Sequence, residues 1–340
     1  MTTTLSPKEL YAALSPLGIK RAQLRSLLPD WWEESLASTT DGGWEFILLV
    51  ARALSLDARA LARGEVKRIG AVRSLAYKHS KKTDATELTG STLIAASLSQ
   101  AIVAAVDRPY SAPPEDPLVV HARLQELGSG TADFNSLLRY CWENGIAVIP
   151  LPHLPVGMKK MDGAALMIGT RPVIVISRRN DSKSWLSFIL GHELGHIALG
   201  HLTPDSSIID VALQKESTYA AESLTDPQET QADAFALSVL GGRHAEAIQA
   251  AWHSRESAVN LAVAARERAA AVGVAPGHLV LRYAFRTKRW PEATTALRFL
   301  SEDFDAQAVV AEALTRHLQP GKLATDVKEL IGKITGVGLE

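Results

Sequence analysis

The sequence is poor in cysteine and has no excess of charge of either sign. Cys141 is its single cysteine among 340 residues, so no internal disulfide bond can form. This excludes a small secreted domain held together by disulfides and favours a reducing compartment, so we expect a cytoplasmic protein. The net charge of −1 gives no overall field that would attract nucleic acid or a membrane surface.

Long hydrophobic runs are also missing. The longest apolar stretch, residues 93–106, is too short to span a bilayer and contains serine and glutamine. The first residues show no basic segment followed by an apolar run, so we expect no signal peptide. With 46% hydrophobic and 21% charged residues, the chain has the composition of a globular protein with two or three domains.

Against this background one motif stands out, the pattern H-E-x-x-H at residues 192–196. On a helix, His192 and His196 are four residues apart and share one face, so both imidazole rings can bind one metal ion. Glu193 can then act as general base toward a water molecule. Histidine and carboxylate are the usual ligands of catalytic zinc, so the pattern predicts a Zn²⁺ site.

The residues around the motif predict a buried helix. They are apolar on nearly every side: Trp185, Leu186, Phe188, Ile189, Leu190, Leu194, Ile197 and Leu199. Two buried imidazoles and a buried carboxylate would be costly unless something satisfies them, and a metal ion does so at once. The alternative is a pair of histidines hydrogen-bonded within a core.

A hydrolytic zinc site needs a third protein ligand, and a second predicted helix at residues 228–237 offers one. Glu229 and Asp233 share a face of this helix. Glu229 would bind the metal, and Asp233 would accept the N–H of a ligating histidine and fix its orientation. Alternatively, Glu229 is only an acid on an exposed first turn. Glu222 is a competing ligand, and the Cys141 thiolate is a candidate zinc switch, unless Cys141 is simply a core residue.

These segments resemble the ImmA/IrrE-type metallo-endopeptidases, zinc proteases that act on transcriptional repressors. The resemblance runs from about residue 137 to 240 and is carried by residues 173–176, 188–201 and 229–236. It implies that zinc is held by His192, His196 and Glu229. The chain departs from the family pattern at Gln231, where the family often has glutamate, and at residues 241–242, where Gly-Gly replaces a frequent Met-Pro.

The expected fold class is α+β and mostly helical. We expect a zincin-like core, in which a small antiparallel sheet of residues 146–149, 164–168 and 172–176 packs against the H-E-x-x-H helix, between helical N-terminal and C-terminal domains. An edge strand beside that helix would hold the substrate by strand addition. The predicted segments are residues 1–82 (helical domain), 83–117 (helical stalk and proline-rich linker), 118–242 (peptidase core) and 243–340 (helical domain, a candidate sensor or partner surface).

Residues 1–82 resemble a degenerate lambda-repressor-like helix-turn-helix domain of the Cro type, most closely at residues 46–61. The segment that would read bases, residues 30–35, is predicted to be helical but is acidic, whereas DNA reading takes basic and amide side chains. The basic run at residues 63–82 could contact phosphates or could be a solvated connector. A DNA- or protein-binding regulator that uses the zinc fold as a scaffold is therefore the alternative function.

The function that these residues favour is peptide hydrolysis by a gluzincin-like zinc metallo-endopeptidase. The resemblance implies a protein substrate, a helix-turn-helix repressor whose cleavage would switch on a stress, mobile-element or defence operon. Tyr283 or Arg282, in a helical segment after the core, could stabilise the oxyanion, or both could be packing residues. His201 is either a helix cap or a further metal ligand, and His153 lies in a proline-flanked loop that could face the site.

Overall fold

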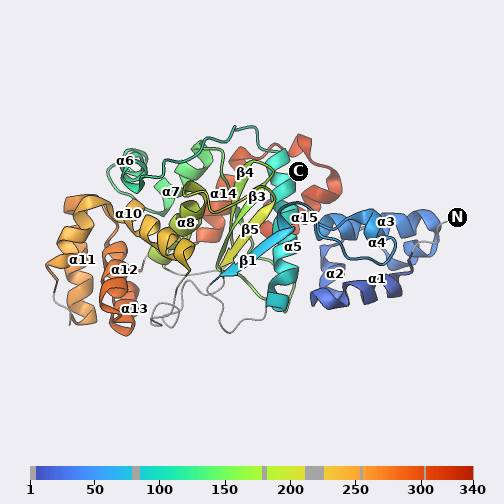
Figure 1. The fold of residues 1–340 in the computed structure, drawn as a ribbon, viewed down its shortest axis with the longest axis horizontal. Helices are drawn as coiled ribbons and strands as arrows, with labels where there is room; N and C mark the ends of the chain where they lie inside the picture. The colour runs from blue at the N-terminus through green and yellow to red at the C-terminus, as the bar shows by residue number, and fades with distance from the viewer. Residues whose placement is uncertain are drawn as a thin grey trace.

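The computed structural model describes residues 5–78, 85–177, 182–210, 226–252, 256–301 and 304–339. Its centre is a five-stranded sheet in the order β1-β5-β3-β4-β2, surrounded by helices (Figure 1). The strands are β1 (Ser74–Lys78), β2 (Ala147–Pro150), β3 (Gly163–Ile168), β4 (Arg171–Ile176) and β5 (Ser206–Asp210).

The sheet is mixed, which corrects the antiparallel sheet that we expected. β3 runs antiparallel to both β4 and β5, whereas β2 is parallel to β4 and β1 is parallel to β5. The three predicted strands are confirmed as β2, β3 and β4, with a tight turn at Gly169, whose φ is +61°. β4 is not an edge strand, because it pairs on both sides.

Two apolar helices cover the sheet. α5 (Ala85–Ala104) and α8 (Lys183–Ala198) both contact β3 and β4, and Figure 1 shows them on opposite sides of the sheet. From Leu88 to Ile102 nearly every residue of α5 is buried. The helix predicted as a stalk between domains is therefore part of the core, because an apolar surface all round the helix must be covered on all sides.

The N-terminal helices are α1 (Pro7–Leu14), α2 (Arg21–Leu27), α3 (Thr40–Ala53) and α4 (Ala58–Leu61). The prediction of a helix across the acidic residues 30–35 is wrong. Only a 3₁₀ turn forms there, at Glu34–Ser38. The Trp32 ring instead stacks on Phe46 of α3 with the ring centroids 5.4 Å apart. Burying this ring fixes the local backbone more strongly than helix propensity does.

Contacts in the structure cross the predicted segment boundaries. Residues 74–78, expected in the N-terminal unit, form β1 in the central sheet. At the other end of the chain, α14 (Ala306–His317) packs on β2, and α15 (Thr325–Thr335) packs on α5. One continuous hydrophobic core links residues from Leu10 to Val337.

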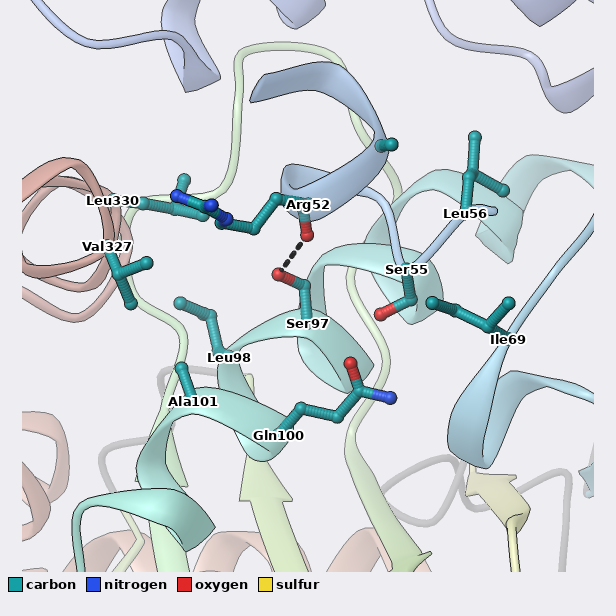
Figure 2. Close-up of a pocket in the computed structure, with 11 residues that line it drawn as sticks. Arg52, Ser55, Leu56, Ile69, Ser97, Leu98, Gln100, Ala101, Val327 and Leu330 are labelled. Carbon is teal, nitrogen blue, oxygen red and sulfur yellow. Dashed lines mark hydrogen bonds between the residues drawn. The ribbon is translucent and has the colours of Figure 1, made fainter. Parts of the chain in front are cut away.

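A cavity of about 350 Å³ lies where α3, α5 and α15 meet (Figure 2). Ser97 of α5 donates a hydrogen bond to the backbone oxygen of Arg52 at 2.6 Å. The Arg52 side chain also forms an ion pair with Asp326 of α15. These contacts tie the N-terminal helices to both the core and the C-terminal end of the chain.

The remaining helices are α6 (Pro117–Leu127), α7 (Phe134–Glu143), α10 (Pro227–Ala250), α11 (Ala258–Val272), α12 (Pro276–Thr287) and α13 (Trp290–Phe299). A tight turn follows α7 at Asn144-Gly145, with a φ of +70° at Gly145. α10 extends well past residue 237, the predicted end of the second helix, and is kinked at Gly242. Among the described residues, no helix has the length and apolar character needed to cross a membrane.

Candidate metal centre

The predicted H-E-x-x-H helix forms as α8. Ser182 caps it by accepting a hydrogen bond from the Trp185 backbone N–H. The motif lies in its last two turns, where His192, Glu193 and His196 are all fully buried. The Nε2 atoms of the two histidines face each other at 3.0 Å.

α10 brings the predicted third ligand to this pair. Glu229 is 3% exposed, and its carboxylate oxygens lie 3.4 Å from His192 Nε2 and 3.5 Å from His196 Nε2. The interpretation of Glu229 as an acid on an exposed first turn is therefore wrong. The helices approach closely because both use small residues, and a Cβ added at Gly195 would lie 3.2 Å from the Cα of Ala232.

A fourth donor, Asp210, was missed by the sequence interpretation. It is the last residue of β5, is fully buried, and places Oδ2 3.6 Å from His192 Nε2. His192, His196, Asp210 and Glu229 each offer one donor atom, and these four atoms all lie within 4.8 Å of one another. The signal was a carboxylate directly after Ile208-Ile209, in a segment for which the sequence predicted no strand.

Hydrogen bonds on the far side of both histidine rings set their orientation. His192 Nδ1 lies 2.9 Å from Asp233 Oδ1, as predicted. His196 Nδ1 lies 2.9 Å from His201 Nδ1, and His201 Nε2 lies 3.1 Å from Gln231 Oε1. Because Gln231 Oε1 can only accept, His201 carries its proton on Nε2 and accepts the Nδ1–H of His196.

These contacts test whether the residues suit a metal ion. With both Nδ1 atoms protonated, His192 and His196 direct lone pairs from Nε2 toward the same point, and Asp210 and Glu229 add negative charge there. A divalent cation satisfies all four donors, whereas a single shared proton cannot. Two imidazoles and two carboxylates are a donor set that zinc accepts, so the cluster fits a metal ion.

The electrostatics of the cluster without a metal follow from burial and close charges. Burial and the neighbouring Asp210 raise the pKa of Glu193 well above its usual value. Burial opposes a charge on His192, but hydrogen bonds to Asp210, Asp233 and Glu229 outweigh it and raise the pKa of this ring well above normal. Burial and the charge on His192 lower the pKa of His196.

β1 and β3 also border the cluster. The Lys78 ammonium forms an ion pair with Asp226 and lies 3.9 Å from Glu229 Oε1. This lysine of the predicted basic run therefore has a structural partner. A Cβ added at Gly163 would lie only 2.2 Å from Glu193 Oε1. Glycine at this position therefore makes room for the Glu193 carboxyl group beside β3.

The other candidates lie elsewhere. The Tyr283 hydroxyl accepts a hydrogen bond from the Glu256 backbone N–H. Arg282 Nη1 donates to the backbone oxygen of Leu237, two helical turns and about 12 Å along α10 from Glu229. Both side chains therefore have partners within the helical packing, and their oxyanion role stays a prediction.

The predicted alternatives for the metal also fall outside the cluster. Cys141 is buried in α7, and burial raises the pKa of its thiol, so it does not join the four donors. His153 donates its backbone N–H to Ile334 at the end of α15, away from the site. Glu222 lies outside the described residues.

A comparison of the chain with protein-family models found no match, and a search of curated proteins found none either. The inference of function therefore depends on the geometry of the site.

Proposed function

We propose that the protein is a zinc-dependent endopeptidase. The observation that carries the proposal is the buried Glu193 carboxyl group beside two histidines and two carboxylates that converge on one point. A site that only stores or senses a metal has no need of a further buried acid, which costs free energy to desolvate. A hydrolase needs this acid as its general base.

Each residue would have a distinct role. His192, His196 and Glu229 would hold the metal, and Asp233 and His201 would orient the two rings. When bound, a zinc ion would polarise the scissile carbonyl group and lower the pKa of a water molecule. Glu193 would take the proton of the attacking water and deliver it to the leaving amine nitrogen. Its raised pKa suits these steps, because a carboxylate with a raised pKa binds a proton more strongly than an ordinary one.

For the substrate, we propose a protein, specifically a helix-turn-helix repressor in the cytoplasm. This part of the proposal is supported by the resemblance of residues 188–201 and 229–236 to the ImmA/IrrE-type peptidases. Cleavage of the repressor would then derepress a stress, mobile-element or defence operon.

The alternative, a DNA-binding regulator built on the same fold, receives less support. The acidic residues 30–35 contribute no recognition helix. In the basic run, Arg63 pairs with Glu65 and Lys78 pairs with Asp226, so part of its positive charge is already neutralised. Phosphate binding would need these cations to be available.

The proposed function is tested with Glu193→Gln, which keeps the size of the side chain but removes its basicity. Zinc content per chain and cleavage of a diverse peptide library are measured for the wild type, for this variant and for Glu246→Gln, a matched change at an exposed position of α10. We expect about one zinc per chain in all three and a loss of cleavage of at least about 100-fold in Glu193→Gln alone. Full cleavage by Glu193→Gln, or no bound zinc in the wild type, would contradict the proposal.

A further inference from the structure

Asp210 gives the metal cluster one protein donor more than hydrolysis needs. We propose that Asp210 is a fourth protein ligand of the metal, and that β5 occupies the place where an extended substrate would pair with β3. The described conformation is then a closed resting form of the enzyme. This inference rests on the proposed function and adds its regulation.

The spacing of the donors supports a closed site. Zinc binds nitrogen and oxygen at about 2.0–2.1 Å, so ligand atoms at the corners of a tetrahedron are about 3.4 Å apart. The distances from His192 Nε2 to His196 Nε2, Glu229 Oε2 and Asp210 Oδ2 are 3.0, 3.4 and 3.6 Å. Structural zinc sites have four protein ligands, whereas catalytic sites keep one position open for water or substrate. Asp210 fills that fourth position.

The register of the sheet explains how Asp210 gets there. β5 is antiparallel to β3, and Asp210 lies opposite Gly163. Gly163 is the residue whose backbone lies against the Glu193 carboxyl group. The backbone oxygen of Asp210 also accepts a hydrogen bond of 2.8 Å from the Asp162 N–H. The end of β5 is thus held beside both the general base and the metal ligands.

A substrate that binds beside Glu193 would need the backbone groups of β3, which is an interior strand of the sheet. Extended peptides commonly bind by adding a strand to a sheet edge, where backbone groups are free to pair. On the side of β3 that faces away from β4, those groups already pair with β5. An extended peptide can reach β3 beside Glu193 only after β5 has moved.

Contacts around β5 show what would have to separate. β1 pairs with its outer side, and the Ser207 hydroxyl donates to the backbone oxygen of Ala71 at 2.7 Å. Lys78, the last residue of β1, is joined to α10 through Asp226. Opening therefore moves β5 away from β3. It also disturbs the contacts of β5 with β1 and with Ala71.

A permanent four-ligand site would explain Asp210 but not Glu193. The Glu193 carboxyl group is fully buried, and Gly163 of β3 leaves the room for it. A site that never opened would bear the free-energy cost of burying Glu193 without using the group. A site that opens uses Glu193 whenever Asp210 leaves.

The first test asks whether the metal has an open position. Co²⁺ replaces zinc, and acetohydroxamate, a small bidentate metal ligand, is titrated while the visible absorption of Co²⁺ is recorded. The proteins are the wild type, Asp210→Asn, and Asp205→Asn as a control that removes a carboxylate just before the opposite end of β5. We expect Asp210→Asn to bind acetohydroxamate at least tenfold more tightly than the wild type and the control, because asparagine is a poor ligand for Co²⁺ and Zn²⁺.

Equal acetohydroxamate binding by all three proteins would overturn the assignment of Asp210 as a ligand. A wild type that binds no Co²⁺ or Zn²⁺ would instead contradict the proposed function, so the two failures are distinguishable. Asp210→Asn preserves side-chain size, and circular dichroism with thermal unfolding checks that it folds. If Asp210→Asn does not fold, Asp210→Ser provides the same comparison.

The second test asks whether β5 is tied to the metal. Amide hydrogen exchange of residues 206–210 is measured with and without zinc in the wild type and in Asp210→Asn. We expect zinc to slow exchange there in the wild type but not in the variant, while β4 changes little in either. Peptide cleavage should also rise at least tenfold in Asp210→Asn and vanish in Asp210→Asn with Glu193→Gln. Zinc-dependent protection of residues 206–210 that persists in Asp210→Asn would refute the tie between strand and metal.

Discussion

At the scale of single residues, the hydrogen bonds behind the histidine rings decide how well those rings can bind a metal ion. His196 depends on His201, and His201 depends on Gln231. The carbonyl oxygen of Gln231 settles which nitrogen of each ring carries a proton, so a residue that never touches the metal selects the nitrogen that does. In the sequence, Gln231 is only a departure from a family pattern. Its contact with His201 becomes visible only in the fold.

This relay can be tested by changing its last acceptor. Gln231→Glu keeps an oxygen acceptor for the His201 Nε2–H, whereas Gln231→Leu removes it at similar size. Loss of such a supporting contact costs about 10–100-fold in metal affinity, so we expect that loss in Gln231→Leu and near wild-type affinity in Gln231→Glu. Competition with a zinc chelator measures both. Equal affinities in the two variants would show that the contact does not orient His196.

A pH dependence also follows at this scale. Without metal, His192 and Glu193 have raised pKa values, so both hold protons to a higher pH than in the unfolded chain. The stability that this adds is complete below the unfolded pKa of about 6.5 for His and 4.3 for Glu, and it is lost as pH rises through the folded values. Zinc replaces the proton on His192. We therefore expect the zinc-induced rise in melting temperature to be larger at pH 8 than at pH 6.

Calorimetric titration checks the same linkage directly. At pH 7, zinc binding measured in two buffers of different ionisation enthalpy should show net proton release. Binding without proton release, together with the same rise in melting temperature at pH 6 and pH 8, would mean that His192 is neutral before the metal binds.

At the scale of elements, the crossing of α8 and α10 sets the distance between the ligands. Gly191 faces Ala236, and Gly195 faces Ala232, so backbone lies almost against backbone. Such close approach leaves no space for a larger side chain. These four residues are small in the sequence, but only the fold shows that they face one another.

Overpacking this crossing should therefore loosen the metal site. Ala232→Leu places a large side chain at a fully buried position, and we expect a loss of about 1–3 kcal/mol in the free energy of unfolding together with weaker zinc binding. Ala234→Leu, an exposed position of the same helix, is the matched control and should change neither. Chemical denaturation and chelator competition measure the two quantities. Unchanged zinc affinity in Ala232→Leu would show that the crossing does not set the ligand spacing.

Strands were harder to predict than helices for a physical reason. The helices at residues 7–14, 306–317 and 325–335 have caps and periodic apolar residues that act locally. β1 and β5 are only five residues long and depend on partners elsewhere in the chain. The β1 sequence lies within the predicted basic run at residues 63–82, and β5 has polar or charged residues at both ends, so local composition indicated neither strand. Missing β5 meant missing Asp210.

At the scale of the whole molecule, the candidate metal ligands come from three elements. α8, β5 and α10 each contribute, and one hydrophobic core joins them to both ends of the chain. Sequence segmentation suggested separable units because proline-rich and charged stretches resemble linkers. Stretches of this composition can also pack on the surface of a domain. Only contacts in the structure, such as that of α15 with α5, distinguish a linker from such a segment.

A shared core implies that the metal stabilises all of it. Zinc at a free concentration of 100 times its dissociation constant should add about 2.7 kcal/mol to the free energy of unfolding. We expect scanning calorimetry to show one transition that moves to higher temperature as a whole when zinc is added. Two transitions, of which only one responds to zinc, would show that residues 1–82 fold as an independent domain after all.

The pairing of β1 with β5 has a consequence for the synthesis of the protein. About 130 residues separate these neighbours in the sequence. At ~5–20 residues per second, β1 leaves the ribosome roughly 6–26 seconds before its partner strand exists. Asp210 and Glu229 are made later still than the two histidines. Each new molecule therefore spends these seconds with β1 unpaired, and all four donors of the candidate metal cluster exist only once residue 229 has been translated.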